Sequence, residues 1–150
     1  MSQPLPLIRY TTASLLCFLV ATIGFEVLAS VLQTQAAVIF SLHESIHSFF
    51  SQPIGSLLLA APFLVIGIVA ANLAKGVGSF QAKVFFVSSV AALGALYLSG
   101  YWAAQQALLA QKWTAAALSV GLLPFQSILI LVLAAFPAGF MFWRAERAKT

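Results

Sequence analysis

The sequence predicts an all-α integral membrane protein with four transmembrane helices, and three observations support this fold class. First, 62% of the 150 residues are apolar and only 7% are charged, with a mean hydropathy of +1.04. An average soluble domain carries about 25% charged residues, so this chain lacks the charges to cover a water-exposed surface. Second, four stretches reach the roughly 20 apolar residues that cross a hydrocarbon core. Third, strand-like alternation is absent, which leaves helices to satisfy the backbone in lipid.

Each expected element follows from its own stretch of sequence. The first apolar run is longer than a signal-peptide core and contains Glu26, so it is interpreted as a retained span. The second span contains Pro62, the third can continue as helix to residue 110, and the fourth has Pro124 near its start. The expected spans, within one domain of residues 1–150, are residues 10–32, 54–74, 84–104 and 122–143, with an amphipathic helix at 36–51.

Basic residues are distributed unevenly between the two sides that four spans create. One side holds the N-terminus, the loop between spans two and three and the C-terminal tail, and it carries six of the seven basic residues. The two loops on the other side carry only one basic residue, Lys112. Because Lys and Arg concentrate in cytoplasmic segments, both termini are expected in the cytoplasm, at a plasma (inner) membrane or its organellar equivalent. This explains the net charge of +4 through topology and contact with anionic lipid, without a nucleic-acid partner. The basic side carries Arg9, Lys75, Lys83, Arg144, Arg147 and Lys149.

Residues 36–51 show the periodicity of an amphipathic helix. Apolar residues gather on one side of a helical wheel and serines with Glu44 on the other, while His43 and His47 lie on the border. The segment is too short and too polar to span, so it is expected to lie along the outer membrane surface. The apolar side is Val38, Ile39, Leu42, Ile46, Phe49 and Phe50, and the polar side is Ser41, Glu44, Ser48 and Ser51.

Within this helix, residues 43–47 read His-Glu-Ser-Ile-His and match the motif His-Glu-x-x-His. That motif places two imidazoles on one helix face to bind zinc, with the Glu acting on the zinc-bound water. The segment resembles the zincin metalloproteases over these five residues only, because the chain has no Asp and offers no evident third ligand, so enzyme activity is not favoured. A zinc or copper site of His43, His47 and Glu26 is one interpretation. A single His bound to haem or a chlorophyll-type pigment is another, and a purely structural role for both His is a third.

Glu26 lies in the outer half of the first span, roughly 7 Å from its centre at the helical rise per residue. A carboxyl group at that depth is costly and is usually paired or functional. Gln126, Gln105 and Gln106 are its expected partners, together with the His pair. Such a polar pocket would suit a proton or cation site, a contact to a quinone, or a simple interhelical hydrogen bond.

The third span carries a small residue at every fourth position, which places these residues near one helix face. Small residues let membrane helices approach closely. The stripe therefore predicts helix packing, either within the chain or against another subunit. Its members are Ala91, Ala95, Ser99, Ala103 and Ala107.

These features favour an accessory or structural subunit of a larger membrane complex, such as an electron-transport or photosynthetic one. Its expected partners are the lipid bilayer and other membrane subunits or further copies of itself. A metal-, haem- or quinone-binding protein that uses the outer His and Glu residues is the alternative. A small cation or proton transporter is the second alternative.

Overall fold

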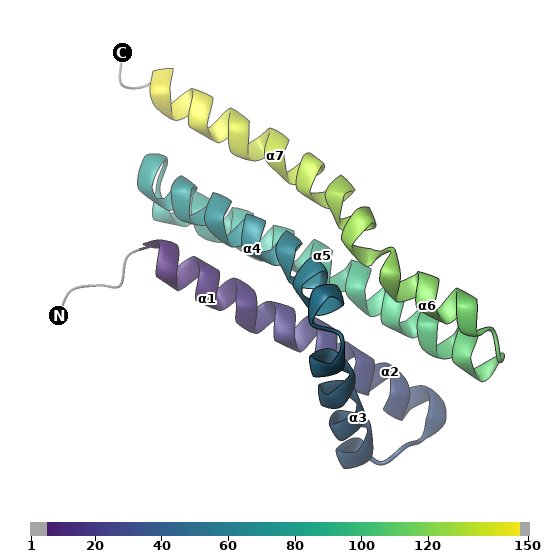
Figure 1. The fold of residues 1–150 in the computed structure, drawn as a ribbon. Helices are drawn as coiled ribbons and strands as arrows, with labels where there is room; N and C mark the ends of the chain where they lie inside the picture. The colour runs from purple at the N-terminus through teal and green to yellow at the C-terminus, as the bar shows by residue number, and fades with distance from the viewer. Residues whose placement is uncertain (1–5, 148–150) are drawn as a thin grey trace.

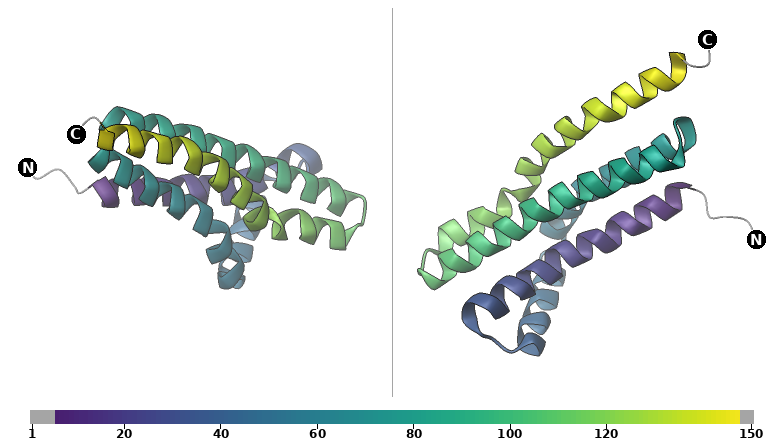
Figure 2. Two further views of the ribbon diagram at one scale, coloured as in Figure 1. Left: turned by 90° about the horizontal axis from the view of Figure 1, so that it is seen from above. Right: turned by 180° about the vertical axis from the view of Figure 1, so that it is seen from behind.

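The computed structural model describes residues 6–147 and is helical, with no strand in that range. Short connections join the helices, and the first span contains one π-helical turn, η1. Figure 1 shows the arrangement, and Figure 2 shows that α3 projects sideways from the other helices. The elements are α1 (Pro6–Leu19), η1 (Val20–Gly24), α2 (Phe25–Thr34), α3 (Val38–Ser51), α4 (Pro53–Gly76), α5 (Ser79–Leu109), α6 (Trp113–Gly121) and α7 (Leu123–Arg147).

The prediction of four apolar helices long enough to cross a membrane is confirmed for the described residues. The first is continuous through α1, η1 and α2, and the fourth combines α6 with α7. That α3 lies along a membrane surface stays a prediction. The four candidate spans are Pro6–Thr34, Pro53–Gly76, Ser79–Leu109 and Trp113–Arg147.

The segment before the fourth span differs from expectation, because residues 113–121 form helix α6 rather than a loop. Its middle reads Ala-Ala-Ala-Leu at residues 115–118, and both residue types are strong helix formers. Pro124 lies at the start of α7, where the missing N–H costs no helical hydrogen bond. As a result, α6 packs against the last turns of α5, and these two helices form an antiparallel pair.

Helix α4 lies at the centre of the bundle and contacts α1, α5 and α7. Its Phe63 is fully buried and makes an edge-to-face ring contact with Tyr97, with centroids 5.2 Å apart. The Tyr97 hydroxyl donates a hydrogen bond of 2.7 Å to the Leu59 carbonyl oxygen, and the Ser14 hydroxyl donates one of 2.7 Å to the Phe63 carbonyl oxygen. Both bonds are made to carbonyls near Pro62, and they join α5 and α1 to the middle of α4.

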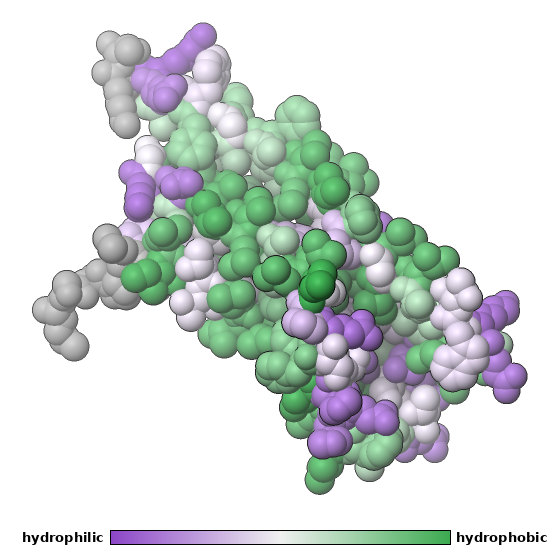
Figure 3. All heavy atoms as spheres, in the orientation of Figure 1, coloured by the Kyte–Doolittle hydropathy of each residue, from purple (hydrophilic) through white to green (hydrophobic). Residues whose placement is uncertain are grey.

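Polar residues gather at the two ends of the bundle, and a broad apolar band separates them (Figure 3). The start of α1, the α4–α5 turn and the end of α7 lie together at one end, here called the basic end (Figure 1). The described basic residues there are Arg9, Lys75, Lys83, Arg144 and Arg147, while Lys149 lies outside the described residues. The opposite end, here called the α3 end, carries α3, the α5–α6 turn and Lys112.

Candidate functional site

The first span changes its packing partner at the π turn, and Glu26 lies directly after that turn. A π turn inserts about one extra residue, which rotates the following residues by roughly 100° around the helix axis. Accordingly, α1 packs chiefly against α4, whereas α2 packs against α5 and α3. Within the turn, the Thr22 hydroxyl donates to the Phe18 carbonyl oxygen over 2.9 Å. Single π turns of this kind are frequent at functional sites. Ionisable residues within apolar spans are also usually functional, so both features mark Glu26 as a candidate site residue.

Glu26 is half-buried, and its carboxyl group lies beside the hydroxyl of Ser45 on α3. One helical turn further along α2, the hydroxyl oxygens of Ser30 and Ser41 lie 3.2 Å apart. Both Ser41 and Ser45 are almost fully buried. We call these four residues the α2–α3 seam, because they join two antiparallel helices through two matched polar pairs.

Two further groups lie within electrostatic range of the Glu26 carboxyl. The Glu44 carboxylate is adjacent to Ser45 on α3 and is exposed, and the Tyr101 side chain approaches from α5 and is 7% exposed. The seam therefore offers carboxyl and hydroxyl oxygens but no imidazole or amide. Chemically, such a group can exchange a proton or hold a hydrogen-bonding partner.

The His pair lies away from the seam. His43 and His47 are both exposed, and each lies two positions beyond a seam serine, which is roughly 200° around the helix. The Ser51 hydroxyl lies 3.4 Å from Nδ1 of His47 and donates to the His47 carbonyl oxygen over 2.7 Å. Among residues 6–147, no three His, Cys, Asp or Glu side chains come close enough to hold a metal ion. The zinc or copper site of His43, His47 and Glu26 stays a prediction, and so does a single His bound to haem or a pigment.

The pairing of Glu26 with the three glutamines stays a prediction. Gln126 and Gln106 are exposed and Gln105 is half-buried, and in the described part of the chain none of them hydrogen-bonds to Glu26. A different amide bridges the helices, because Gln33 Nε2 donates to the Trp102 carbonyl oxygen over 3.2 Å.

The seam serines were missed at the sequence level, although a signal for them exists. Glu26 and Ser30 are four residues apart, and so are Ser41 and Ser45. Two polar pairs at helical spacing on either side of a short connection are what an antiparallel helix hairpin needs to pair 26 with 45 and 30 with 41. The amphipathic pattern places Ser41 on the polar side of the helix and gives no role to Ser45 or Ser30.

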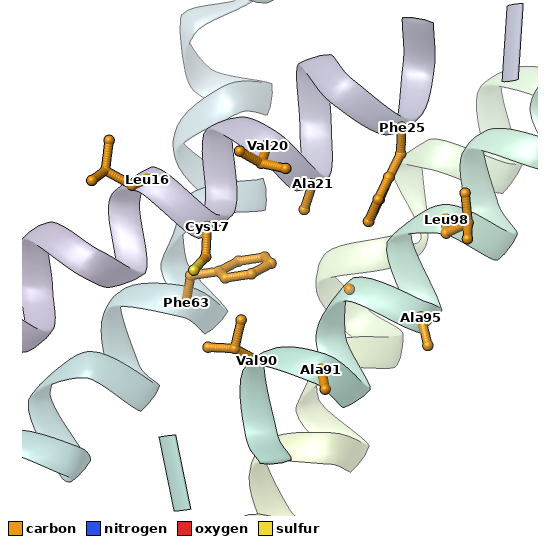
Figure 4. A pocket seen from close by; sticks show the side chains of 11 residues that line it. Leu16, Cys17, Val20, Ala21, Phe25, Phe63, Val90, Ala91, Ala95 and Leu98 are labelled. Carbon is orange, nitrogen blue, oxygen red and sulfur yellow. The ribbon is translucent and has the colours of Figure 1, made fainter. Parts of the chain in front are cut away.

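A second feature of the site is an apolar groove between the first span and α5. The groove has a volume of about 420 Å³, which is in the range of ligand pockets, and its walls are almost entirely carbon. Figure 4 shows Phe63 of α4 between the two walls and Cys17, the chain's single cysteine, on the α1 wall. The lining residues are Leu16, Cys17, Val20, Ala21, Phe25, Phe63, Val90, Ala91, Gly94, Ala95 and Leu98.

The small-residue stripe of α5 does not lie in the interior of the bundle. Ala91, Ala95, Ser99 and Ala103 are exposed, and Ala107 is half-buried. The first two line the groove, and the other three lie beyond it toward the α3 end. Packing of the stripe within the chain and its contact with another subunit both stay predictions.

No protein-family model matches the chain, and no curated protein or solved structure shows significant similarity to it.

Proposed function

We propose that this chain is a structural subunit of a larger membrane complex and that α5 docks against a transmembrane helix of a partner. The observation that carries the proposal is the exposure of the small residues Ser99 and Ala103 on α5. Small residues at a spacing of four bring helix backbones close together, and in lipid this packing is the main source of helix association. The exposed part of the stripe outside the groove, Ser99 and Ala103, is therefore a surface available for such packing.

The chemistry of this surface fits an apolar helix rather than a polar ligand. The Ser99 hydroxyl already donates to the Leu96 carbonyl oxygen of its own helix, over 2.7 Å. It therefore needs no hydrogen-bond acceptor from a partner. Trp102 is 37% exposed beside the stripe and provides a large ring for the partner to pack against. In this proposal the basic end faces the cytoplasm, following the unequal distribution of Lys and Arg.

The test is purification of the full chain in a mild detergent, followed by mass spectrometry of every protein that accompanies it. We expect a membrane protein in stoichiometric amount. An Ala103→Leu variant should reduce that recovery roughly tenfold, because a side chain that separates the backbones removes much of the packing energy. Ala61→Leu is the matched control, since Ala61 is exposed on α4 and lies outside the stripe.

Two outcomes would contradict the proposal. One is recovery of the wild-type chain as a stable protein with no partner. The other is equal loss of the partner in the Ala103→Leu and Ala61→Leu variants, which would show that the stripe has no special role.

A further inference from the structure

Two cationic side chains stand at the basic end in line with the two walls of the apolar groove. On α1, Arg9 precedes the lining residue Leu16 by seven positions, and on α5, Lys83 precedes the lining residue Val90 by the same number. Seven residues correspond to nearly two full turns, so each cation lies close to the same helix face as its lining residue, roughly 10 Å nearer the basic end. Both cations are exposed.

An aromatic contact holds these two walls together at the level of the cations. Tyr10 follows Arg9 directly, and its ring meets that of Phe86 on α5 edge to face, with centroids 5.4 Å apart. Phe86 lies three residues after Lys83, on about the same helix face. The Tyr10–Phe86 contact therefore joins α1 and α5 at the helical level of both cations, on the basic-end side of the groove.

The depth of the groove fits a hydrocarbon chain. Its lining residues lie in the middle parts of three candidate spans, where acyl chains surround the protein. Between the cations and the groove, the exposed residues of the two helices are Thr12 and Leu15 on α1 and Val84, Val87 and Ser88 on α5, and none of them is charged. The region between α1 and α5 thus changes from cationic at the basic end to almost purely carbon at mid-membrane depth.

We propose that this region is a binding site for an anionic phospholipid, with the phosphate between Arg9 and Lys83 and the end of one acyl chain in the groove. Charge selects the headgroup, because a Lys or Arg near an anionic membrane surface contributes about 1 kcal/mol, or roughly fivefold in affinity. The apolar groove selects a ligand with a long chain, so free phosphate would gain only the weaker, exposed half of the site. This inference does not rest on the proposed partner, because it concerns the isolated chain.

The experiment counts lipids retained by the purified full chain in native mass spectrometry, after incubation with dioleoyl phosphatidylglycerol or dioleoyl phosphatidylcholine. We expect one phosphatidylglycerol molecule to be retained roughly tenfold better than phosphatidylcholine. The double variant Arg9→Gln/Lys83→Gln should lose most of this preference. The matched control Lys75→Gln/Arg144→Gln removes two exposed cations from the same end, and it should keep the preference.

A second variant tests the groove without touching the charges. Ala95→Phe places a ring in the groove and should reduce retention of phosphatidylglycerol at least fivefold, whereas Ala61→Phe on α4 should not. Cys17 gives an independent readout, because N-ethylmaleimide should modify it more slowly in vesicles containing phosphatidylglycerol than in pure phosphatidylcholine vesicles. Equal losses in both cation pairs, or unchanged retention in Ala95→Phe, would overturn the proposal. Retention of glycerol phosphate as strongly as of the whole lipid would overturn it as well.

Discussion

The two halves of the first span are held by different kinds of contact. In α1, the Ser14 hydroxyl bonds to the Phe63 carbonyl oxygen, and the helix backbone lies close to Gly67 of α4. In α2, side chains alone make the polar contacts to α3, through Glu26 with Ser45 and Ser30 with Ser41. The π turn between the halves allows one continuous helix to present both surfaces.

The difference shows which interactions tolerate change. A backbone that touches a glycine leaves no room for a side chain, so the α1–α4 contact depends on shape. Hydrogen bonds between membrane helices contribute little on average, about 0.6 kcal/mol, because the separated helices also find partners. We therefore expect the α1–α4 contact to control the stability of the whole bundle, and the α2–α3 seam to control only the position of α3.

The largest effect is predicted for Gly67→Leu. A Cβ atom at this position would lie 2.7 Å from Ser14 Oγ and 3.0 Å from the Tyr10 carbonyl oxygen, so α1 must move away from α4. Overpacking of this kind costs about 3 kcal/mol, and the free energy of unfolding should fall by that amount. Titration of the protein in mixed micelles with a denaturing detergent, followed by circular dichroism, measures the loss.

Gly139→Leu is the control, because a Cβ there meets nothing within 4 Å. Its effect should stay within about 0.5 kcal/mol, as for surface substitutions in general. A double-mutant cycle adds detail: Ser14→Ala should recover part of the smaller loss caused by Gly67→Ala, since it removes the nearer of the two obstructing oxygens. Equal losses at Gly67 and Gly139 would show that the α1–α4 contact is not tight.

The sequence predicted the four apolar helices because their signal is summed over about 20 residues and no other element of this composition is stable in lipid. It also predicted a helix near residues 36–51, and the structure contains α3 at Val38–Ser51. It did not predict the π turn at Val20–Gly24, because a single extra residue in a turn leaves no periodic trace in an apolar stretch.

The site was harder to predict than the fold because polar groups were assigned by type rather than by position. The depth of Glu26 in an apolar span marks it from sequence alone, whereas the residue type of Ser45 does not distinguish it from the glutamines and histidines as a neighbour. In a close helix pair a small hydroxyl is the better partner, since it bonds without separating the backbones. The groove was not predictable, because it depends on how three helices diverge.

An intermediate and local effect is predicted for Ser45→Ala. The substitution removes the hydroxyl that lies beside the Glu26 carboxyl. Ser45 itself is only 3% exposed. The loss should be about 0.6 kcal/mol, which corresponds to roughly threefold faster amide exchange in α3 if that helix opens by itself. Hydrogen–deuterium exchange of the chain in nanodiscs compares α3 with α4.

The matched control is Ser48→Ala, which removes an exposed hydroxyl from the same helix. It should leave exchange in α3 unchanged. If Ser45→Ala instead accelerates exchange in α1 and α4 as strongly as in α3, the seam would be part of the global core, and the distinction between the two halves of the first span would be wrong.

The smallest effect is predicted for the double variant His43→Ala/His47→Ala. Both side chains are exposed. The Ser51 hydroxyl lies 3.4 Å from His47 Nδ1, a distance longer than that of most hydrogen bonds. The free energy of unfolding should therefore change by less than about 0.5 kcal/mol.

Elemental analysis and an absorption spectrum of the wild type and of the double variant test whether the two His bind a metal or a pigment. Stoichiometric zinc, copper or a visible band in the wild type that disappears in the variant would establish a ligand site on α3. Unchanged spectra and metal content would leave Glu26 as the chemically distinctive group at the α3 end, because its partner lies on the opposite face of the helix that carries the two His.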